Sequence, residues 1–267
     1  MERKRIPIAL TIAGSDSGGG AGIQADLKVF ASLGVHGTSA ITCVTAQNPR
    51  RVLGIEACTP SIVRRQMEAV FEELRPAAVK TGMLYSAGIV RAVADFFGGR
   101  RGVPLVVDPV MIATSGARLL ESSAIQSLKT RLLPLASVVT PNLDEAALLA
   151  GRKLRSIEDL RWAARQIHRQ FGCAALVKGG HLTGGAEAVD IFFDGKEELL
   201  LSAPFIRGVR THGTGCTYSA AIAAFLSKGE KLPQAVVRAK EYISQAIWQS
   251  NDVGKQQALN AFWNVKR

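Results

Sequence analysis

The feature that most constrains the fold is a regular alternation of apolar, β-branched segments with segments that repeat at helical spacing. Residues 7–15, "PIALTIAGS", form an apolar run ending in Gly and Ser, which is typical of a buried strand. Residues 21–34 then place Ile23, Leu27 and Phe30 on one helical face and stop at Gly34. The alternation continues to a last long helix predicted over 232–250, and it predicts an α/β fold with a mostly parallel sheet covered by helices on both faces.

The remaining predicted elements follow the same rhythm. Strands are expected at 38–48, 51–59 (a shorter strand at an edge), 77–84, 103–111, 137–142 and 174–180, and within 188–205 as two strands around a turn at Asp194-Gly195. Helices are expected at 61–74, 86–99, 122–136, 143–151, 156–172 and 216–229, with Ser61 and Ser156 as N-caps and a capping box from Ser156 with Asp159.

A single domain spanning residues 1–267 is expected. Of the 267 residues, 47% are hydrophobic and 21% are charged, which provides for a substantial core. No apolar run approaches the roughly 20 residues of a membrane span. The start, "MERKRIPIAL", runs directly into a Gly-rich loop, which favours a first strand over a secretion signal.

The cysteines favour a reducing compartment. Cys43, Cys58, Cys173 and Cys216 include no CxxC pair and no Cys/His cluster with zinc spacing. A disulfide framework is not expected in a chain of this length without a secretion signal. We therefore expect free thiols and a cytoplasmic location.

The formal net charge of +11 raises the question of nucleic-acid binding. The positive residues are scattered in short groups such as Arg50-Arg51 and Arg100-Arg101, and aromatic residues, at 6%, do not interleave with them. A nucleic-acid binder would show binding that falls steeply with salt. We expect instead a solvated surface that attracts anionic ligands in general, with neither a nucleic acid nor a membrane as partner.

Polar and Gly-rich stretches follow the predicted strands one after another. They read "AGSDSGGGAG", "TAQN", "KTGM", "DPVM", "TPNLDE" and "KGGH" in chain order. In open α/β sheets the ligand lies at the carboxyl ends of the strands. The sequence therefore predicts one site assembled from most of the chain.

The first of these loops, within "GSDSGGGAGIQAD", lets backbone N–H groups approach a ligand closely. It is not a Walker A loop, because no GK[ST] follows, and it is not a clean GxGxxG fingerprint. On the residues alone, a flexible strand-to-helix turn is an equally good interpretation.

Two later loops carry carboxylates that could bind Mg²⁺. Asp108 ends an apolar strand, where it could hold the ion or simply cap the next turn. Asn142 and Glu145 lie three apart at a helix start, where the helix dipole favours a carboxylate. By themselves these two residues favour capping over metal binding.

Lys178 follows an apolar strand and precedes two glycines, so it could present a mobile positive charge to a phosphate or lie exposed at the strand end.

The stretch "HGTGCT" then places Gly213, Thr214 and Gly215 at a helix start, where successive N–H groups would hold a transferring phosphoryl group. The helix dipole should lower the thiol pKa of Cys216. The alternative for this cysteine is a small buried apolar side chain.

Taken together and in this order, "AGSDSGGGAGIQADLK", "VTAQN", "KTGML", "DPVM", "TPNLDEA", "VKGGH" and "THGTGCT" resemble the hydroxymethylpyrimidine/phosphomethylpyrimidine kinases, thiamine-biosynthesis members of the ribokinase superfamily. The resemblance spans about 8–250. It implies a ribokinase-like three-layer sandwich, a homodimer, and ATP- and Mg²⁺-dependent phosphorylation of 4-amino-5-hydroxymethyl-2-methylpyrimidine and then of its monophosphate. The family often has a Gly/His-rich stretch near the end, where this chain has "VGKQQALNAFW".

The resemblance also implies roles for individual residues. Gln47 would recognise the pyrimidine, since an amide offers both donors and an acceptor, and Cys216 would accept the hydroxyl proton at the position of the superfamily's catalytic base. The other implied residues are the pocket wall of Gly14, Ala21 and Met83, a polar contact near the substrate from Asp26, nucleotide contacts from Lys178, Asn142 and Thr211, and metal contacts from Glu145 and Asp108.

Other functions remain open at this level. A pyridoxal kinase of the same superfamily phosphorylates a similar hydroxymethyl heteroaromatic compound, although Gln47 favours the aminopyrimidine. A nicotinamide-dependent oxidoreductase should have an acidic residue at the end of the second strand, where this chain has "TAQN". A cysteine hydrolase would need an oriented histidine base, and the sequence shows no Asp or Asn partner for His212.

Overall fold

The computed structural model describes residues 5–100, 102–111, 120, 122–180, 182, 186–206 and 212–265. Its centre is a nine-stranded sheet in the order β3-β2-β1-β4-β5-β6-β7-β8-β9. From β2 to β7 all neighbouring strands are parallel, while β3, β8 and β9 are added antiparallel at the edges. The strands are β1 (Ile8–Asp16), β2 (His36–Asn48), β3 (Arg51–Ala57), β4 (Ala78–Thr81), β5 (Leu105–Val107), β6 (Val138–Val139), β7 (Ala174–Lys178), β8 (Glu187–Phe193) and β9 (Glu198–Pro204).

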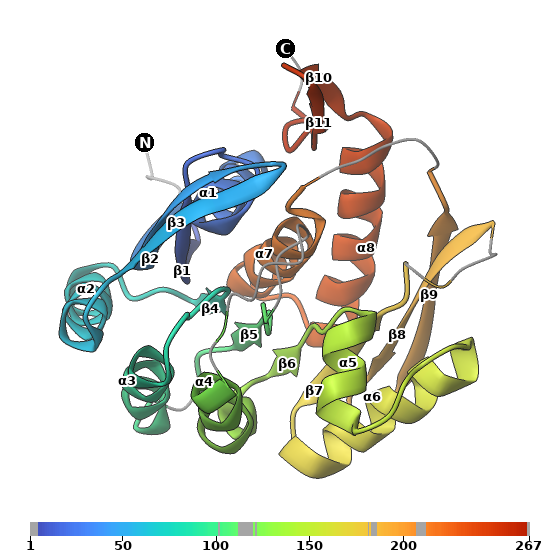
Figure 1. The fold of residues 1–267 in the computed structure, drawn as a ribbon, viewed down its shortest axis with the longest axis horizontal. Helices are drawn as coiled ribbons and strands as arrows, with labels where there is room; N and C mark the ends of the chain where they lie inside the picture. The colour runs from blue at the N-terminus through green and yellow to red at the C-terminus, as the bar shows by residue number, and fades with distance from the viewer. Residues whose placement is uncertain are drawn as a thin grey trace.

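Helices cover both faces of the sheet, so the fold has three layers, as predicted (Figure 1). One face packs against α2 (Pro60–Glu73), α3 (Ala87–Gly98), α4 (Ser122–Ser127), α5 (Leu143–Ala150) and α6 (Ile157–Phe171), and the other against α1 (Gly22–Ser32), α7 (Thr214–Ser227) and α8 (Leu232–Trp248). Successive strand residues point to opposite faces. Leu105 and Val107 therefore enter the first core, and Val106, between them, enters the second.

Helix α7 is buried along most of its length. All its residues from Thr217 to Ser227 are buried, and several of them are alanine or serine. Such small side chains let its backbone approach β1, β4 and β5, against which it packs. The start of α7 is thereby placed beside the carboxyl ends of the central strands.

Several sequence expectations are corrected by the structure. The N-cap of α2 is Thr59, whose side chain accepts from the Ile62 amide, because Pro60 at the first helical position begins the helix before Ser61. The single helix expected over 122–136 is α4 followed by a π turn (Leu128–Leu132) and a 3₁₀ turn (Leu133–Leu135), since Pro134 cannot continue an α-helix.

Two further elements were not predicted. The short strands β10 (Asn251–Val253) and β11 (Gln256–Ala258) form an antiparallel hairpin after α8.

The expected turn at Asp194-Gly195 is confirmed, as is the Ser156 cap on α6. In the part of the chain that the structure describes, no helix has the length and apolar character needed to cross a bilayer.

Candidate active site

A cavity of about 1370 Å³ lies at the carboxyl ends of the parallel strands, between the start of α7 and the loops that follow β1, β2, β5 and β7. Of the residues singled out in the sequence, it is lined by Gly14, Ala21, Gln47, Met83, Asp108, Asn142, Glu145, Lys178, Gly213, Thr214, Gly215 and Cys216. Thr211 lies outside the described residues. The expectation of one site built from most of the chain is therefore met.

Asp16, at the end of β1, organises the first glycine loop. Its carboxylate accepts the backbone N–H groups of Gly18 (2.8 Å), Gly20 (3.1 Å) and Ala21 (2.8 Å). Gly22 follows with φ +57°, and a Cβ there would lie 2.3 Å from the Gly14 carbonyl oxygen. The loop consequently requires glycine where it turns into α1.

The pocket wall forms around Gly14. A Cβ on this residue would lie 2.7 Å from Cys43 Sγ and 2.9 Å from Met83 Cε, so the two sulfur-bearing side chains close against the bare backbone. Met83 and Cys43 form their own small apolar cluster, with Ile55 and Val110 packed against it. This end of the cavity therefore has an apolar wall suited to an aromatic ring.

Gln47, at the end of β2, meets His212, which precedes α7. Gln47 Nε2 lies 3.0 Å from His212 Nε2, and the same ring nitrogen lies 3.3 Å from Asp16 Oδ2. Asp16 is thus the acidic partner of His212 that the sequence did not reveal. His212 Nε2 faces Asp16 and Gln47, and His212 Nδ1 has no hydrogen-bond partner in the described part of the chain. Among the described residues, neither ring nitrogen therefore binds a cysteine thiol, as the base of a cysteine hydrolase would.

Asp26 is not brought into the cavity. Its side chain is fully buried in α1, where it binds Lys80 Nζ at 2.8 and 3.0 Å and accepts from Thr11 Oγ1 at 2.5 Å. Lys80, from β4, lines the cavity in its place. Burial opposes the charge of Lys80, but the adjacent Asp26 carboxylate raises the pKa of the ammonium group above its usual value.

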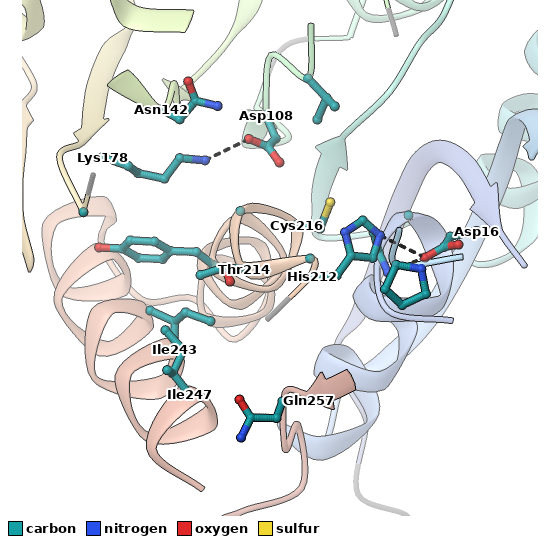
Figure 2. A pocket seen from close by; sticks show the side chains of 18 of the residues that line it. Asp16, Asp108, Asn142, Lys178, His212, Thr214, Cys216, Ile243, Ile247 and Gln257 are labelled. Atoms are coloured by element: carbon teal, nitrogen blue, oxygen red, sulfur yellow. Dashed lines mark hydrogen bonds and ion pairs between the residues drawn. The ribbon is translucent and has the colours of Figure 1, made fainter. Parts of the chain in front are cut away.

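The second lysine, Lys178, ends β7 and reaches Asp108 at the end of β5. Its Nζ lies 3.1 Å from Asp108 Oδ1, and Figure 2 shows the two side chains pointing toward each other. Burial opposes the charge, but Asp108 and Glu145 raise the pKa of Lys178. Asp108 Oδ1 also accepts from Thr140, while Asp108 Oδ2 is buried without a hydrogen-bond partner among the described residues.

Asn142 and Glu145 form the capping box of α5, so the capping interpretation holds. Asn142 Oδ1 accepts the Glu145 amide and Glu145 Oε2 accepts the Asn142 amide, each at 2.9 Å. A parallel bridge between Asn142 and Lys178 holds this turn beside β7. Burial raises the pKa of Glu145 to about 7, against the attraction of Lys178, which brings a readily neutralised carboxyl to the cavity.

These carboxylates suit one kind of metal site and not another. Among the residues described by the structure, no group of three or more His, Cys, Asp or Glu could hold an ion by itself. Mg²⁺, however, commonly takes one or two protein carboxylates and completes its shell with water and substrate phosphates. The unpartnered Asp108 Oδ2 and the nearby Glu145 fit that arrangement.

The start of α7 supplies the anion cradle. Gly213 is the N-cap with φ +83°, and a Cβ there would lie 1.8 Å from the Gly20 carbonyl oxygen, so the two glycine loops touch. As a glycine, this N-cap has no side chain with which to cap the helix, and its backbone faces the cavity. A Cβ on Gly215 would lie 3.2 Å from Lys178 Nζ, so the cradle and the lysine face the same space.

Cys216 lies in the first turn of α7 and lines the cavity. The prediction of a lowered thiol pKa is wrong, because burial raises it to about 11, outweighing the attraction of Lys80. The helix N-terminus is therefore not sufficient to form a thiolate at neutral pH. The thiol is therefore largely protonated at neutral pH, and Lys80, which is fully buried, and Lys178, which is partly exposed, both interact with it electrostatically.

The far end of the cavity was missed by the sequence analysis. Ile243 and Ile247 of α8 line it together with Phe205 and Ile206 after β9, and Gln257 of the terminal hairpin lies at the same end (Figure 2). The four-residue spacing of the two isoleucines was the available signal, but it also describes an ordinary core-facing helix. An apolar slot with amide groups beside it suits a planar nitrogen base.

Comparison with known proteins agrees with this geometry. Residues 16–260 match the family model for phosphomethylpyrimidine kinase. A hydroxymethylpyrimidine/phosphomethylpyrimidine kinase of Rhizobium meliloti is 54% identical over 90% of this chain and 90% of its own. The thiamine biosynthesis bifunctional protein ThiED of Geobacter sulfurreducens is 48% identical over 92% of this chain, which spans 50% of that longer protein.

Solved structures of the same fold include a pyridoxal kinase and a phosphomethylpyrimidine kinase. An ADP complex of Bacillus subtilis pyridoxal kinase superposes with a TM-score of 0.89 at 36% identity, covering 96% of this chain and 98% of the other. A phosphomethylpyrimidine kinase from Clostridium difficile superposes with a TM-score of 0.80 at 41% identity, covering 91% and 100%. The match over most of the chain, together with the cavity, shows that the protein is a ribokinase-like phosphotransferase and belongs to the phosphomethylpyrimidine kinase family.

Proposed function

We propose that the protein transfers the γ-phosphoryl group of ATP to the hydroxymethyl oxygen of 4-amino-5-hydroxymethyl-2-methylpyrimidine, and then a second phosphoryl group to the resulting monophosphate, in thiamine diphosphate biosynthesis. One observation carries the proposal. A single cavity is lined by Gln47 at the end proposed for the aromatic substrate, by Lys178 at the centre proposed for the phosphates, and by Ile243 in the apolar slot.

The residues divide the work of phosphoryl transfer. The substrate ring lies against Met83 and Gly14, with Gln47 hydrogen-bonded to its edge, and the nucleotide base lies in the slot near Ile243. The hydroxyl oxygen attacks the γ-phosphorus, the bond to the β-phosphate oxygen breaks, and ADP leaves. Positioning and charge neutralisation supply most of the rate in such reactions, and here the cradle at Gly215 and the ammonium of Lys178 provide both.

Cys216 receives the proton of the attacking hydroxyl in this proposal. Only its ionised thiolate can accept this proton, and because burial raises the thiol pKa to about 11, that form is a small fraction of the protein at neutral pH. Late proton transfer is compatible with a loose transition state, in which little charge develops on the attacking oxygen before the bond forms. Lys80 opposes the effect of burial on the thiol and so favours its deprotonated form.

Mg²⁺ is the metal that the carboxylates fit. Asp108 and Glu145 would hold it together with nucleotide phosphates and water, and it would neutralise phosphate charge during transfer. Burial raises the pKa of Glu145, and a bound divalent cation would lower it again by favouring the ionised carboxylate.

Three further properties belong to the proposal. The four cysteines are free thiols, which supports a reducing, cytoplasmic setting. A homodimer and one kinase domain over residues 1–267 follow from the resemblance to the family, and light scattering coupled to gel filtration tests the first of these.

The deciding experiment measures ATP consumption with Mg²⁺ and resolves the products by mass. The substrates are hydroxymethylpyrimidine, its monophosphate, and pyridoxal, since a pyridoxal kinase shares the fold. Monophosphate and diphosphate formed from the pyrimidine are the expected result. Turnover of pyridoxal alone would overturn the substrate assignment, and no turnover of any compound would overturn the proposed reaction.

A further inference from the structure

Three side chains from distant parts of the chain meet at the substrate end of the cavity. Asp16 ends β1, Gln47 is the second-last residue of β2, and His212 precedes the N-cap of α7. His212 Nε2 lies 3.3 Å from Asp16 Oδ2 and 3.0 Å from Gln47 Nε2. One ring nitrogen therefore faces both a carboxylate and an amide, and the position of its hydrogen decides how the amide is oriented.

Asp16 is an acceptor in this arrangement. It accepts three backbone N–H groups of the first glycine loop, from Gly18, Gly20 and Ala21. Burial alone would raise the pKa of Asp16, but the hydrogen bonds from His212, Ala21 and Gly18 outweigh it and hold the pKa below its usual value. An ionised carboxylate has no hydrogen to donate, so the hydrogen between Asp16 and His212 must belong to the histidine.

The opposite ring nitrogen leads to the same conclusion. His212 Nδ1 is buried and has no hydrogen-bond partner among the described residues. A hydrogen on Nδ1 would be an unsatisfied donor, whereas a hydrogen on Nε2 has the Asp16 carboxylate as acceptor. Leaving a buried donor unsatisfied is destabilising, so Nε2 is the protonated nitrogen.

A protonated Nε2 conflicts with an amide nitrogen at 3.0 Å, because both atoms then carry hydrogen. Half a turn about the last side-chain bond of Gln47 exchanges its oxygen and nitrogen without moving other atoms. The oxygen then accepts from His212, and the NH₂ group turns toward the cavity.

We infer that His212, held by Asp16, is a positioning residue that fixes the Gln47 amide with its oxygen toward the imidazole and its NH₂ group toward the substrate. The inference rests on the proposed function for the nature of that substrate. In this orientation the NH₂ group donates to a ring nitrogen of the pyrimidine. The second lone pair of the amide oxygen remains for the exocyclic amine, so the pair recognises the adjacent acceptor and donor of an aminopyrimidine edge.

The surrounding backbone holds this arrangement in place. A Cβ on Gly20 would lie 3.1 Å from His212 Cδ2, so the glycine loop closes on the imidazole ring. Ser17 Oγ accepts from the backbone N–H of Gln47 and donates to the backbone carbonyl oxygen of Gln47, each at 2.8 Å. Neither the ring nor the end of β2 can therefore move away without breaking contacts of the first loop.

The tautomer is tested directly by nitrogen-15 NMR of the histidine rings in the full chain, without substrate. The chain has four histidines, and the spectrum of His212→Phe identifies the signals of His212 by their loss. The expected result is a hydrogen on Nε2 with an unprotonated Nδ1. A hydrogen on Nδ1 alone would overturn the inference, because Nε2 would then accept from Gln47 and leave its oxygen facing the cavity.

The positioning role is tested by a double-mutant cycle on pyrimidine affinity, measured by calorimetry in the absence of ATP. Loss of the histidine hydrogen bond in His212→Phe should weaken binding about tenfold, the order expected for one hydrogen bond. Gln47→Ala should weaken it at least as much. Adding His212→Phe to Gln47→Ala should then change affinity by less than about twofold, because coupled residues are not additive.

The control is His36→Phe, the same substitution at an exposed histidine at the start of β2. It should leave pyrimidine affinity unchanged. Additive losses in the cycle, or an equal loss of ATP affinity in His212→Phe, would overturn the positioning role and indicate general damage to the cradle. A wild-type protein that binds no pyrimidine would overturn the proposed function and the substrate part of the inference, while the spectrum would still decide the tautomer.

Discussion

The two buried lysine–aspartate pairs that flank Cys216 differ in how completely they are satisfied. In the pair between Lys80 and Asp26, both side chains are 0% exposed and the carboxylate is bound by Lys80 and Thr11. In the pair between Lys178 and Asp108, the lysine side chain is 13% exposed and Asp108 Oδ2 has no partner among the described residues.

This difference teaches which charges belong to the scaffold and which to the reaction. In a saturated, fully buried pair the carboxylate has no free hydrogen-bonding capacity for a ligand, but Lys80 places a fixed positive charge at the cavity wall. An incomplete pair at the cavity surface can exchange partners when phosphate and metal arrive. The first pair should therefore control stability, and the second should control turnover.

The largest expected effect comes from breaking the closed pair. Asp26→Ala leaves the buried ammonium of Lys80 without its carboxylate, and such changes typically cost about 3–5 kcal/mol of unfolding free energy. Urea denaturation measures the loss. Asp95→Ala, which removes the exposed partner of Arg131, is the matched control and should cost at most about 1 kcal/mol. Equal losses in the two variants would remove the distinction between buried and exposed pairs.

Breaking the open pair should act on the reaction. Lys178→Met removes the ammonium that faces the cradle, and turnover should fall on the order of 10²–10³-fold, as for other groups that stabilise transition-state charge. Its loss of stability should be smaller than that of Asp26→Ala. Lys153→Met, at an exposed lysine, should leave turnover unchanged. A stable, fully active Lys178→Met enzyme would contradict the division of roles.

Cys216 interacts electrostatically with the lysines of both pairs, Lys80 and Lys178. Cys216→Ala should lower turnover about 10²-fold, as expected for loss of a proton acceptor, with ATP affinity largely kept. Because the thiol pKa is raised to about 11, wild-type turnover should rise with pH in the alkaline range, and this rise should vanish in the variant. Cys58→Ala, at a partly buried cysteine in the loop before α2, is the control. An identical pH profile in the two variants would exclude Cys216 as the acceptor.

The smallest expected effect sharpens the description of the open pair. The pKa of Glu145 is raised from 4.5 to about 7, so the folded protein binds more protons than the unfolded chain between these values. Stability should therefore fall as pH rises through this window, by on the order of 1–3 kcal/mol from this group. Glu145→Gln, whose amide oxygen can still accept the Asn142 N–H, should remove that dependence.

Thermal denaturation of the wild type and Glu145→Gln from pH 5 to 8 measures the difference. The two proteins should diverge with rising pH, with the variant the more stable one at pH 8. Mg²⁺ with ATP should reduce the gap, because a cation favours the ionised carboxylate. Parallel curves would show that Glu145 is ionised in the folded protein throughout this range.

The order of elements, the layers and the location of the site could be predicted from the sequence, because each depends on periodicity or on loops that end strands. Depth within the fold could not. Asp26 was predicted to contact the substrate and Lys80 lay within a predicted strand. Only the packing of α1 against β1 buries the carboxylate against Lys80 and leaves the lysine at the cavity wall.

Pairings between distant segments were equally hidden. His212 meets Asp16 only because α7 packs beside β1 and brings its leading residues to the first loop. The thiol pKa of Cys216 was predicted from its helix position alone, but burial affects it more strongly than any other influence. Local sequence carries information about helix termini, but it carries none about how much protein surrounds them.

The position of α7 late in the chain has a consequence for biosynthesis. All nine strands of the sheet precede α7, and one face of the sheet, including Ala78, Val106, Val138 and Leu176, is covered largely by α7 and α8. A nascent chain that ends at β9 therefore contains every strand of the sheet but lacks the two helices that cover most of this face. That apolar face is covered only when α7 and α8 follow, and the same two helices line the cavity.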